Sequence, residues 1–338
     1  MAGQTREYVM IISEDHQRLC FPGSRWDDLN ALYPFTVLRS ARNMSPDEWA
    51  AMCGEAEIIA GMWGIPPLPR GADADGLPRY VCYMCGAVGG FINEEHLAKG
   101  VRVTNWGDSI AHTIAESALM GILACLRRVG YYHEIAHHEG GWRPPALAGV
   151  ESASLFGRRV GLLGFGQIAR KLVPLLRPFR VEVFAYDPYV PDDVFSSLGV
   201  TRVRCLEELF RRCAIVSNHA ANVDELAGAV NESLLDLLPD DGVFVNTARG
   251  RTVNEADLVA QHEAGRLWSC LDVFDPEPPA PNHPLRRQAR CIITPHQAGP
   301  TRDSYHLMGE RCLLNLRNWK EGKPLVGEIT PEMLRRMT

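Results

Sequence analysis

The sequence has no long hydrophobic run. No apolar stretch in its 338 residues approaches the roughly 20 that a membrane-spanning helix needs. The first segment, MAGQTREYVMIISEDHQ, has an apolar run too short for a secretory signal peptide, and acidic residues follow at once. We therefore expect a cytoplasmic protein without a membrane partner.

Clusters of basic residues are also absent. Lys and Arg number 35 against 41 Asp and Glu, the formal net charge is -6, and no Lys/Arg-rich block occurs. This balance gives no electrostatic reason to expect a nucleic-acid partner. Hydrophobic residues make up 46% of the chain and charged residues 22%, which excludes wholesale disorder. The length allows two ordinary domains.

The ten cysteines lack the regular spacings of a disulfide framework. In a chain of this size they indicate buried free thiols in a reducing compartment. Cys82 and Cys85 form the one pair with a metal or redox spacing, but they lie in a strand-like segment without a second pair or a histidine nearby. We expect no metal.

The first hundred residues alternate strand and helix signals. A helix is expected over 45–53, where Ser45, Pro46 and Glu48 form a capping box, and another over 93–100. Apolar strands separated by short helices favour a parallel α/β sheet. The strands are expected at 8–13, 35–40, 56–63, 79–85 and 101–105.

A long helix at 109–128 is apolar nearly all round, so we expect it to be buried in its domain or against a second subunit. A loop is expected at 141–149. A second strand–helix alternation then runs from 159 to about 296, and the last helix, 301–320, has an apolar stripe, which predicts two α/β lobes. The stripe comprises Tyr305, Met308, Cys312, Leu316 and Trp319, and the strands of the second lobe are expected at 158–164, 181–186, 214–219, 242–248, 267–274 and 291–296.

The stretch GLLGFGQIAR (161–170) is typical of a dinucleotide-binding turn between a buried strand and a helix. Gly164 permits the tight turn, Gly166 lets the main chain approach a pyrophosphate, and Ala169 replaces a third glycine where only packing matters. Asp187 ends the next strand, where a carboxylate binds ribose hydroxyls and repels a 2′-phosphate. NAD is therefore favoured over NADP. Pro174 should kink or shorten the helix, as should Pro178 just beyond it.

Three polar residues follow the carboxyl ends of predicted parallel strands, where ligands bind in such sheets. Arg249 could clamp a carboxylate through paired hydrogen bonds. His296 suits proton exchange with an alcohol or carbonyl, and Glu277 could fix its tautomer. Singly, each has a simpler structural explanation: a loop cap, a solvated side chain or a hydrogen-bonded histidine. Together, behind a cofactor turn, they indicate catalysis.

At these residues the sequence resembles the D-isomer-specific 2-hydroxyacid dehydrogenase family. The motifs that carry the resemblance are NWGDSIAHTIAESALMGILACLRR, GRRVGLLGFGQIAR with Asp187, VFVNTARGRTVNEADL, LDVFDPEPP and ITPHQAG. It implies a Rossmann NAD-binding domain (106–299) inserted into a flavodoxin-like substrate domain (1–105 and 300–338). It further implies a homodimer formed through the cofactor domain and the long helix.

The resemblance also implies roles for individual residues. Arg249 would bind the carboxylate and carbonyl of a small 2-keto acid, and His296, supported by Glu277, would act as the general acid/base. The loop Gly86, Ala87, Val88 and Gly89 would hold the carboxylate through backbone N–H groups. The implied cofactor contacts are Gly164, Gly166, Gln167, Ile168, Asp187, His219, Thr247, Ala248, Arg249, Asp272, His296 and Gly299.

Departures from the family pattern leave the substrate open. Glu277 excludes formate dehydrogenases, which have glutamine there, and we expect the short form without the regulatory domain of the long phosphoglycerate enzymes. The proline that usually follows the equivalent of His219 is missing, so the loop near the nicotinamide could differ. Met62 and Trp63 could crowd the substrate pocket or favour an apolar side chain.

Two alternatives share these motifs. One is an NAD(H)-sensing binding protein like the corepressors that retain the same three residues, although this sequence lacks a long disordered tail. The other is a dehydrogenase of the same family that acts on a different substrate, such as phosphite. The L-lactate type is disfavoured because its glycine turn lies near the N-terminus rather than at residue 164.

Overall fold

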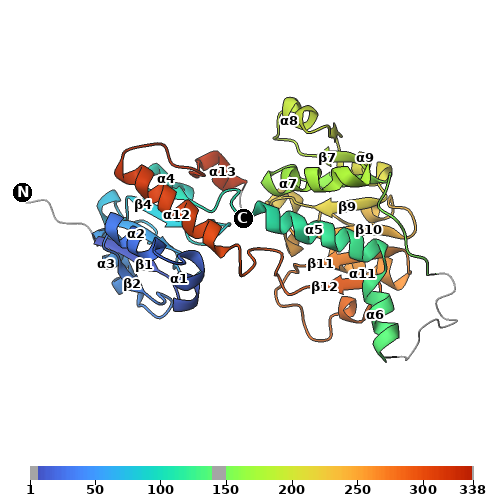
Figure 1. Ribbon diagram of the computed structural model, residues 1–338, viewed down its shortest axis with the longest axis horizontal. Coiled ribbons are helices and arrows are strands. Elements are labelled where there is room, and N and C mark those ends of the chain that lie inside the picture. Colours follow the sequence, from blue (N-terminus) through green and yellow to red (C-terminus); the bar gives the residue numbers. More distant parts are fainter. Residues whose placement is uncertain (1–6, 139–149, 337–338) are drawn as a thin grey trace, which may run out of the picture. The chain divides into compact units, whose positions relative to one another are not determined.

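The protein is described from a computed structural model that covers residues 7–138 and 150–336. The loop expected at 141–149 lies outside these residues. The chain divides into two compact units, unit 1 (Met1–Ile110 and Pro300–Thr338) and unit 2 (Ala111–Gly299). Each contains one parallel sheet with helices packed around it (Figure 1).

Unit 1 has a five-stranded parallel sheet in the order β2-β1-β3-β4-β5. This is the flavodoxin-like order, as expected. The five strands predicted in this region are all present. They are β1 (Glu7–Ile11), β2 (Thr36–Leu38), β3 (Ala56–Gly61), β4 (Tyr80–Tyr83) and β5 (Arg102–Thr104).

The helices of unit 1 include two that the sequence analysis did not identify, α1 (Glu14–Cys20) and α2 (Arg25–Leu32). The predicted capping box is confirmed at the start of α3 (Pro46–Glu55): Glu48 N–H donates to Ser45 Oγ, and Ser45 N–H donates to Glu48 Oε2. The remaining helices are α4 (Glu94–Ala98), α12 (Tyr305–Lys320) and α13 (Pro331–Arg335).

The final long helix, α12, begins at Tyr305 rather than at residue 301. Residues 301–304 instead form a turn, because Ser304 N–H donates to Thr301 O and Thr301 N–H donates to Ser304 Oγ. The predicted apolar stripe is confirmed, since Met308, Cys312 and Leu316 are buried. α12 thus returns the chain to unit 1 after unit 2 is complete.

Unit 2 has a seven-stranded parallel sheet in the order β12-β11-β10-β9-β6-β7-β8. The first six of these strands along the chain, β6 to β11, follow the Rossmann order, which confirms the predicted fold class. The predicted strands are all present, and β8 was not predicted because two residues carry no periodicity. The strands are β6 (Arg159–Leu163), β7 (Glu182–Tyr186), β8 (Thr201–Arg202), β9 (Ile215–Asn218), β10 (Gly242–Asn246), β11 (Leu267–Leu271) and β12 (Cys291–Ile293).

The long apolar helix of unit 2 is α5 (Ala111–Leu126), which is followed by α6 (Val129–His138). It packs on the sheet through small buried side chains such as Ala115 and Ala118, whereas Met120 is 50% exposed. In the chain alone, the helix is therefore buried on one side only. The other helices are α7 (Gln167–Leu176), α8 (Asp192–Ser197), α9 (Leu206–Arg212), α10 (Glu232–Leu235) and α11 (Glu255–Glu263).

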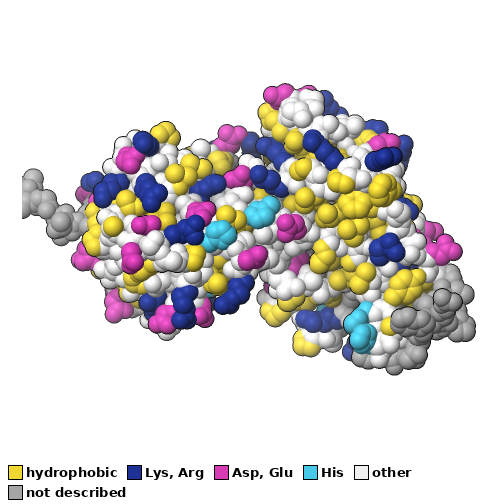
Figure 2. Space-filling model, viewed as in Figure 1, with side chains coloured by type: hydrophobic (Ala, Val, Ile, Leu, Met, Phe, Trp, Pro, Cys, Tyr) yellow, Lys and Arg dark blue, Asp and Glu magenta, His cyan; other side chains and the backbone are white. Residues whose placement is uncertain are grey.

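The distribution of surface charge and the burial of the cysteines agree with what the composition predicts. On the face seen in Figure 2, acidic and basic side chains are interspersed over both units. The cysteines are free, and all but Cys205 and Cys291 are buried. Within residues 7–138 and 150–336, no helix is both long enough and apolar enough to cross a membrane.

One buried histidine of unit 2 makes stability depend on pH. His262 on α11 is 3% exposed, and its Nε2 lies 2.7 Å from Ser269 Oγ. Burial lowers the pKa of His262 from 6.5 to about 4, and Arg290 adds to this effect. The unfolded chain therefore binds a proton near pH 6.5 that the folded chain takes up only near pH 4.

We predict that the free energy of unfolding decreases as the pH falls from 6.5 to 4, with up to about 3 kcal/mol coming from His262. His262→Gln should make this decrease shallower, because glutamine can keep a hydrogen bond to Ser269 without titrating. Urea unfolding across this pH range measures the effect. The exposed His137→Gln is the control, and equal slopes for the two variants would contradict the prediction.

Candidate active site

The glycine turn lies at the centre of the unit 2 sheet. β6 lies between β9 and β7, so the strand order reverses there, and the turn at Gly164 follows the carboxyl end of β6. This reversal is the usual ligand-binding point of an open α/β sheet.

Position 164 requires glycine for two structural reasons. Its φ is +86°, and a Cβ atom would lie 2.7 Å from the carbonyl oxygen of His219. Gly166, by contrast, has no atom within 4 Å of a Cβ position, and no side chain caps α7 there. Ala169 is fully buried, as its packing role requires. The turn therefore leaves open space at the amino end of α7, where Gln167 and Ile168 begin the helix.

Pro174 lies inside α7, which ends at Leu176, and Pro178 lies in the 3₁₀ turn Arg177–Phe179 that follows. The helix continues past Pro174 and ends two residues before Pro178. The first turn, which carries the candidate pyrophosphate contacts, lies before both prolines.

Asp187, at the end of β7, lies beside the glycine turn. Its Oδ2 accepts a hydrogen bond from Phe165 N–H (2.9 Å), and its Oδ1 accepts bonds from Tyr189 N–H (2.9 Å) and Val190 N–H (3.2 Å). These bonds fix the position of the carboxylate, which retains lone pairs for further donors.

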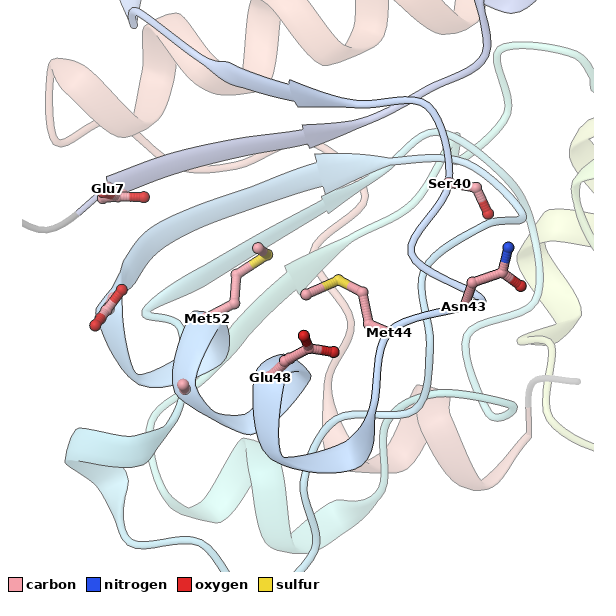
Figure 3. Close-up of a pocket in the computed structure, with 8 residues that line it drawn as sticks. Glu7, Ser40, Asn43, Met44, Glu48 and Met52 are labelled. Carbon is pink, nitrogen blue, oxygen red and sulfur yellow. The ribbon is translucent and has the colours of Figure 1, made fainter.

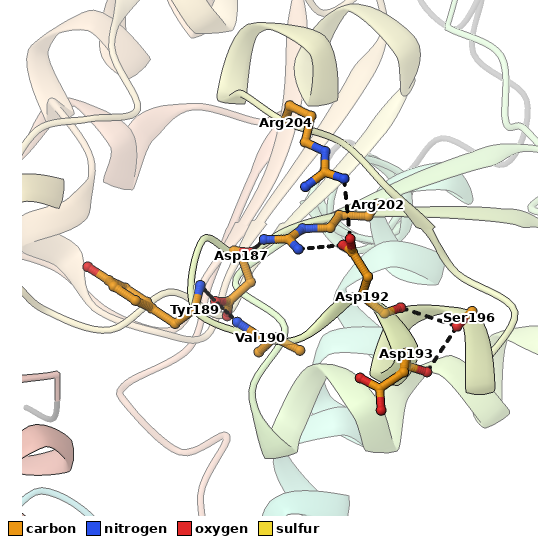
Figure 4. A network of polar contacts seen from close by, with 8 residues as sticks. All are labelled: Asp187, Tyr189, Val190, Asp192, Asp193, Ser196, Arg202 and Arg204. Carbon is orange, nitrogen blue, oxygen red and sulfur yellow. Dashed lines mark hydrogen bonds and ion pairs between the residues drawn. The ribbon is translucent and has the colours of Figure 1, made fainter.

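Two arginines near Asp187 are paired with another acid (Figure 4). Arg202 donates to the Asp187 carbonyl oxygen (2.9 Å) and pairs with Asp192, and Arg204 reaches the same Asp192 at 3.4 Å. Asp192 therefore offsets part of the positive charge that could otherwise attract an additional phosphate.

The loop after β10 holds Arg249 through its main chain. The Arg249 carbonyl oxygen accepts hydrogen bonds from Asn246 Nδ2 (3.0 Å) and Thr252 Oγ1 (2.8 Å). Asn218, at the end of β9, donates to Thr252 Oγ1 (2.7 Å) and to Asn246 Oδ1 (3.2 Å). The sequence analysis missed this buried network, whose only signal was amide side chains at the ends of two apolar strands.

The Arg249 side chain is half-buried. Nη1 donates to the carbonyl oxygen of Ala248 (2.7 Å), and in the described structure the other guanidinium nitrogens have no hydrogen-bond partner. Burial lowers the pKa of Arg249, and the negative charge of Glu277 opposes this effect. The group remains a cation, since arginine titrates far above neutrality, and it has free donors for an anion.

His296 and Glu277 come together as predicted. His296 Nδ1 lies 2.6 Å from Glu277 Oε2, and the other carboxylate oxygen accepts a bond from Phe274 N–H (3.0 Å). The His296 side chain is 51% exposed, and its Nε2 has no partner among the residues described. The backbone of His296 is left-handed, with φ +49°, a conformation that surrounding contacts must hold.

Asp272, at the end of β11, supplies those contacts. Its buried carboxylate accepts hydrogen bonds from Thr294 Oγ1 (2.6 Å), Gln297 N–H (2.9 Å) and Ala298 N–H (2.9 Å). Its carbonyl oxygen accepts a bond from His296 N–H (2.9 Å). Asp272 was predicted as a cofactor contact; the geometry adds that it positions the loop carrying His296.

Two buried polar atoms near the same strand ends lack partners in the described structure. They are His219 Nδ1, just after β9, and Thr247 Oγ1, just after β10. Burial lowers the pKa of His219 to about 4, so its ring is neutral at pH 7. Unpaired buried groups are costly, and these two fit a site that a polar cofactor completes. Gly299, another predicted contact, has no atom within 4 Å of a Cβ position.

The predicted carboxylate loop follows β4 in unit 1. Among the described residues, no acceptor binds the N–H groups of Gly86, Ala87, Val88 or Gly89. The carbonyl oxygen of Gly86 accepts a bond from Asn105 Nδ2 (2.7 Å), and a Cβ on Gly86 would lie 2.6 Å from the Trp106 ring. The loop is therefore fixed from one side and offers a row of free donors, as an anion site requires.

A separate hollow of about 560 Å³ lies beside α3 (Figure 3). It contains none of the predicted site residues, and Glu48 within it is already used in the capping box. It is therefore a poor candidate for the active site. In residues 7–138 and 150–336, no group of three or more His, Cys, Asp or Glu side chains could hold a metal ion.

Comparison with known proteins identifies the family. Residues 119–298 match the family described as "D-isomer specific 2-hydroxyacid dehydrogenase, NAD binding domain". Glyoxylate reductase of Aeropyrum pernix is 31% identical over 244 residues, which cover 70% of each chain. The chain belongs to the D-isomer-specific 2-hydroxyacid dehydrogenase family. It is an NAD-dependent oxidoreductase, and its cofactor is NAD(H).

Other relatives differ in length or only share the fold. D-3-phosphoglycerate dehydrogenase of Methanocaldococcus jannaschii is 29% identical over 212 residues, which are 62% of this chain but 40% of that protein. The structure of D-mandelate dehydrogenase from Rhodotorula graminis aligns with a TM-score of 0.82 at 21% identity, over 96% of this chain and 98% of that one. This second likeness shows the fold alone.

Gly250 tests how Arg249 and Glu277 are held together, because a Cβ on Gly250 would lie 2.0 Å from the carbonyl carbon of Phe274. We predict that Gly250→Ala forces the two segments apart and destabilises the protein by about 1–3 kcal/mol. Gly54→Ala is the control, since its Cβ would meet the nearest atom at 3.5 Å. Urea unfolding measures both variants, and equal stability would disprove the constraint.

Proposed function

We propose that the protein interconverts a 2-keto acid and a D-2-hydroxy acid with NAD(H), and that unit 2 binds the cofactor while unit 1 provides the substrate loop. The observation that carries this proposal is the His296–Glu277 pair, 2.6 Å apart, at strand ends that also carry Arg249. The same edge of the sheet carries the glycine turn, Asp187 and the unpartnered atoms of His219 and Thr247.

The proton transfer in this proposal is assigned to His296. Glu277 accepts the Nδ1–H bond, which leaves Nε2 as the atom that donates a proton to the carbonyl oxygen during reduction and accepts one during oxidation. The half-exposed ring presents that nitrogen to substrate. When bound, NADH supplies the hydride. The same contact with Glu277 keeps the His296 ring in the orientation and tautomer in which Nε2 faces the substrate.

Substrate binding is assigned to two groups of donors. The unpaired guanidinium nitrogens of Arg249 bind the substrate carboxylate and carbonyl oxygen, a geometry for which the planar guanidinium is suited. The free N–H groups of Gly86–Gly89 provide further hydrogen bonds to the carboxylate. Both groups of donors supply positive potential to the substrate carboxylate.

Cofactor selection is assigned to Asp187. Its carboxylate is fixed beside the glycine turn by three N–H groups, so it accepts bonds from ribose hydroxyls and repels a 2′-phosphate. The pairing of Arg202 and Arg204 with Asp192 engages part of the positive charge that a 2′-phosphate would need. This arrangement favours NAD over NADP.

We also propose a homodimer formed through unit 2. The support is exposed apolar surface on two successive helices. Met120 on α5 is 50% exposed, and Val129 at the start of α6 is 52% exposed. Burying these side chains against a second copy would remove apolar area from water.

His296→Ala should lower turnover by roughly 10²–10⁴-fold, the usual effect of losing a general acid/base. Most NADH binding should persist, because His296 is only one of the implied cofactor contacts and the glycine turn and Asp187 are unchanged. Steady-state NADH oxidation with a panel of 2-keto acids measures turnover, and NADH fluorescence titration measures binding. Near-normal turnover would show that the proton takes another path.

Arg249→Ala is the matched comparison, because it should chiefly raise KM for the keto acid rather than remove proton transfer. Binding of NADH without turnover of any keto acid by the wild-type protein would contradict the proposed function as a whole.

A further inference from the structure

Three aromatic rings gather at the end of the unit 1 sheet where the strands finish. His16 lies in the first turn of α1, just after β1; Trp63 follows β3; and Tyr305 begins α12. The His16 ring centroid lies 5.6 Å from that of Trp63 and 5.4 Å from that of Tyr305. We call these three residues the aromatic cluster.

The aromatic cluster is ordered but open. Trp63 is 44% exposed. Its backbone is held in place, because its carbonyl oxygen accepts a hydrogen bond from Arg42 Nη2 at 3.2 Å. His16 Nδ1 lies 2.9 Å from Ser13 Oγ, and this contact restrains the orientation of the His16 ring. An exposed indole held in place offers apolar area to a ligand at little cost in side-chain entropy.

Three buried, weakly polar side chains lie close to the cluster. Cys20, Met62 and Cys85 are buried, and Cys20 Sγ lies 3.8 Å from Met62 Sδ. Burial, with the nearby Cys20 and Cys85 thiols, raises the pKa of Tyr305, so its phenol is neutral at pH 7. Methionine and cysteine sulfur atoms make favourable contacts with aromatic rings.

The cluster adjoins the candidate carboxylate loop. β3 and β4 are neighbouring strands in which Gly61 pairs with Tyr83, and Met84 N–H donates to the carbonyl oxygen of Gly61 (2.8 Å). Trp63 and the Cys85–Gly86 segment therefore follow adjacent strand ends. In a 2-keto acid, only the carbonyl carbon separates the carboxylate from the side chain. A carboxylate on the Gly86–Gly89 donors therefore has its side chain close to this region, which also follows the carboxyl ends of parallel strands.

On the basis of the proposed function, we propose that the aromatic cluster binds the substrate side chain and makes the enzyme prefer 2-keto acids that carry an aromatic ring. Phenylpyruvate would stack on Trp63 and Tyr305 and cover their exposed faces. Glyoxylate and pyruvate are too small to do so and would leave the cluster in water. Aromatic rings gain from such contacts beyond the area they bury.

The wild-type protein should reduce phenylpyruvate with a kcat/KM about 10–100-fold above that for glyoxylate, the range that an apolar pocket provides. Trp63→Ala should lower kcat/KM for phenylpyruvate by a similar factor of about 10–100 and leave that for glyoxylate nearly unchanged. Trp63→Phe and Tyr305→Phe keep a ring and should retain most of the preference.

Phe156→Ala, which removes a 59% exposed aromatic ring in unit 2, is the matched control and should not change the ratio. Thermal unfolding of each variant reports whether it folds, and the wild-type ratio tests the inference even where a variant does not. An equal loss with every substrate in Trp63→Ala would show a structural role and overturn the inference.

Turnover of glyoxylate without an aromatic preference would overturn the inference and leave the proposed function intact. If no keto acid is reduced, the proposed function and the inference fail together. The wild-type substrate series therefore separates the two.

Discussion

The carboxylate of Asp272 is the interaction on which the candidate active site depends. It is buried at the end of β11 and takes three hydrogen bonds from the loop after β12. That loop holds His296 with a left-handed backbone and a side chain that meets Glu277, which itself follows β11. Asp272 thus fixes the neighbouring ends of β11 and β12. The close packing of Gly250 on Phe274 attaches the end of β10, which carries Arg249.

Much of this arrangement could be predicted from the sequence. The apolar strands and the spacing of Gly164, Gly166 and Asp187 define the sheet and its turn, because parallel strands bring their carboxyl ends to one edge. The roles of Asn218, Asn246 and Thr252 could not, since a hydrogen-bond network depends on side chains that only folding brings together. The short strand β8 and the first two helices lack a strong period, and α12 starts late because its first four expected residues form a turn.

The two units have different kinds of site. Unit 2 presents charged and hydrogen-bonding groups at its sheet edge, which suit reactions common to the whole family. Unit 1 presents free N–H groups beside aromatic and sulfur-bearing side chains, and we propose that these discriminate one keto acid from another. The sequence shows Trp63 but not its ring neighbours, so the proposed preference for aromatic substrates could be derived only from the folded structure.

The most direct test of the account is the rate of keto acid reduction by Glu277→Gln. Glutamine can still accept the Phe274 N–H bond, but its neutral amide accepts the His296 Nδ1–H bond more weakly than a carboxylate does, so the ring is held less firmly for proton transfer. We expect kcat to fall at least about tenfold, which corresponds to an increase in activation free energy of about 1.4 kcal/mol or more. NADH affinity in a fluorescence titration should be unchanged. An unaltered kcat would contradict the assignment of the His296–Glu277 pair as the proton donor.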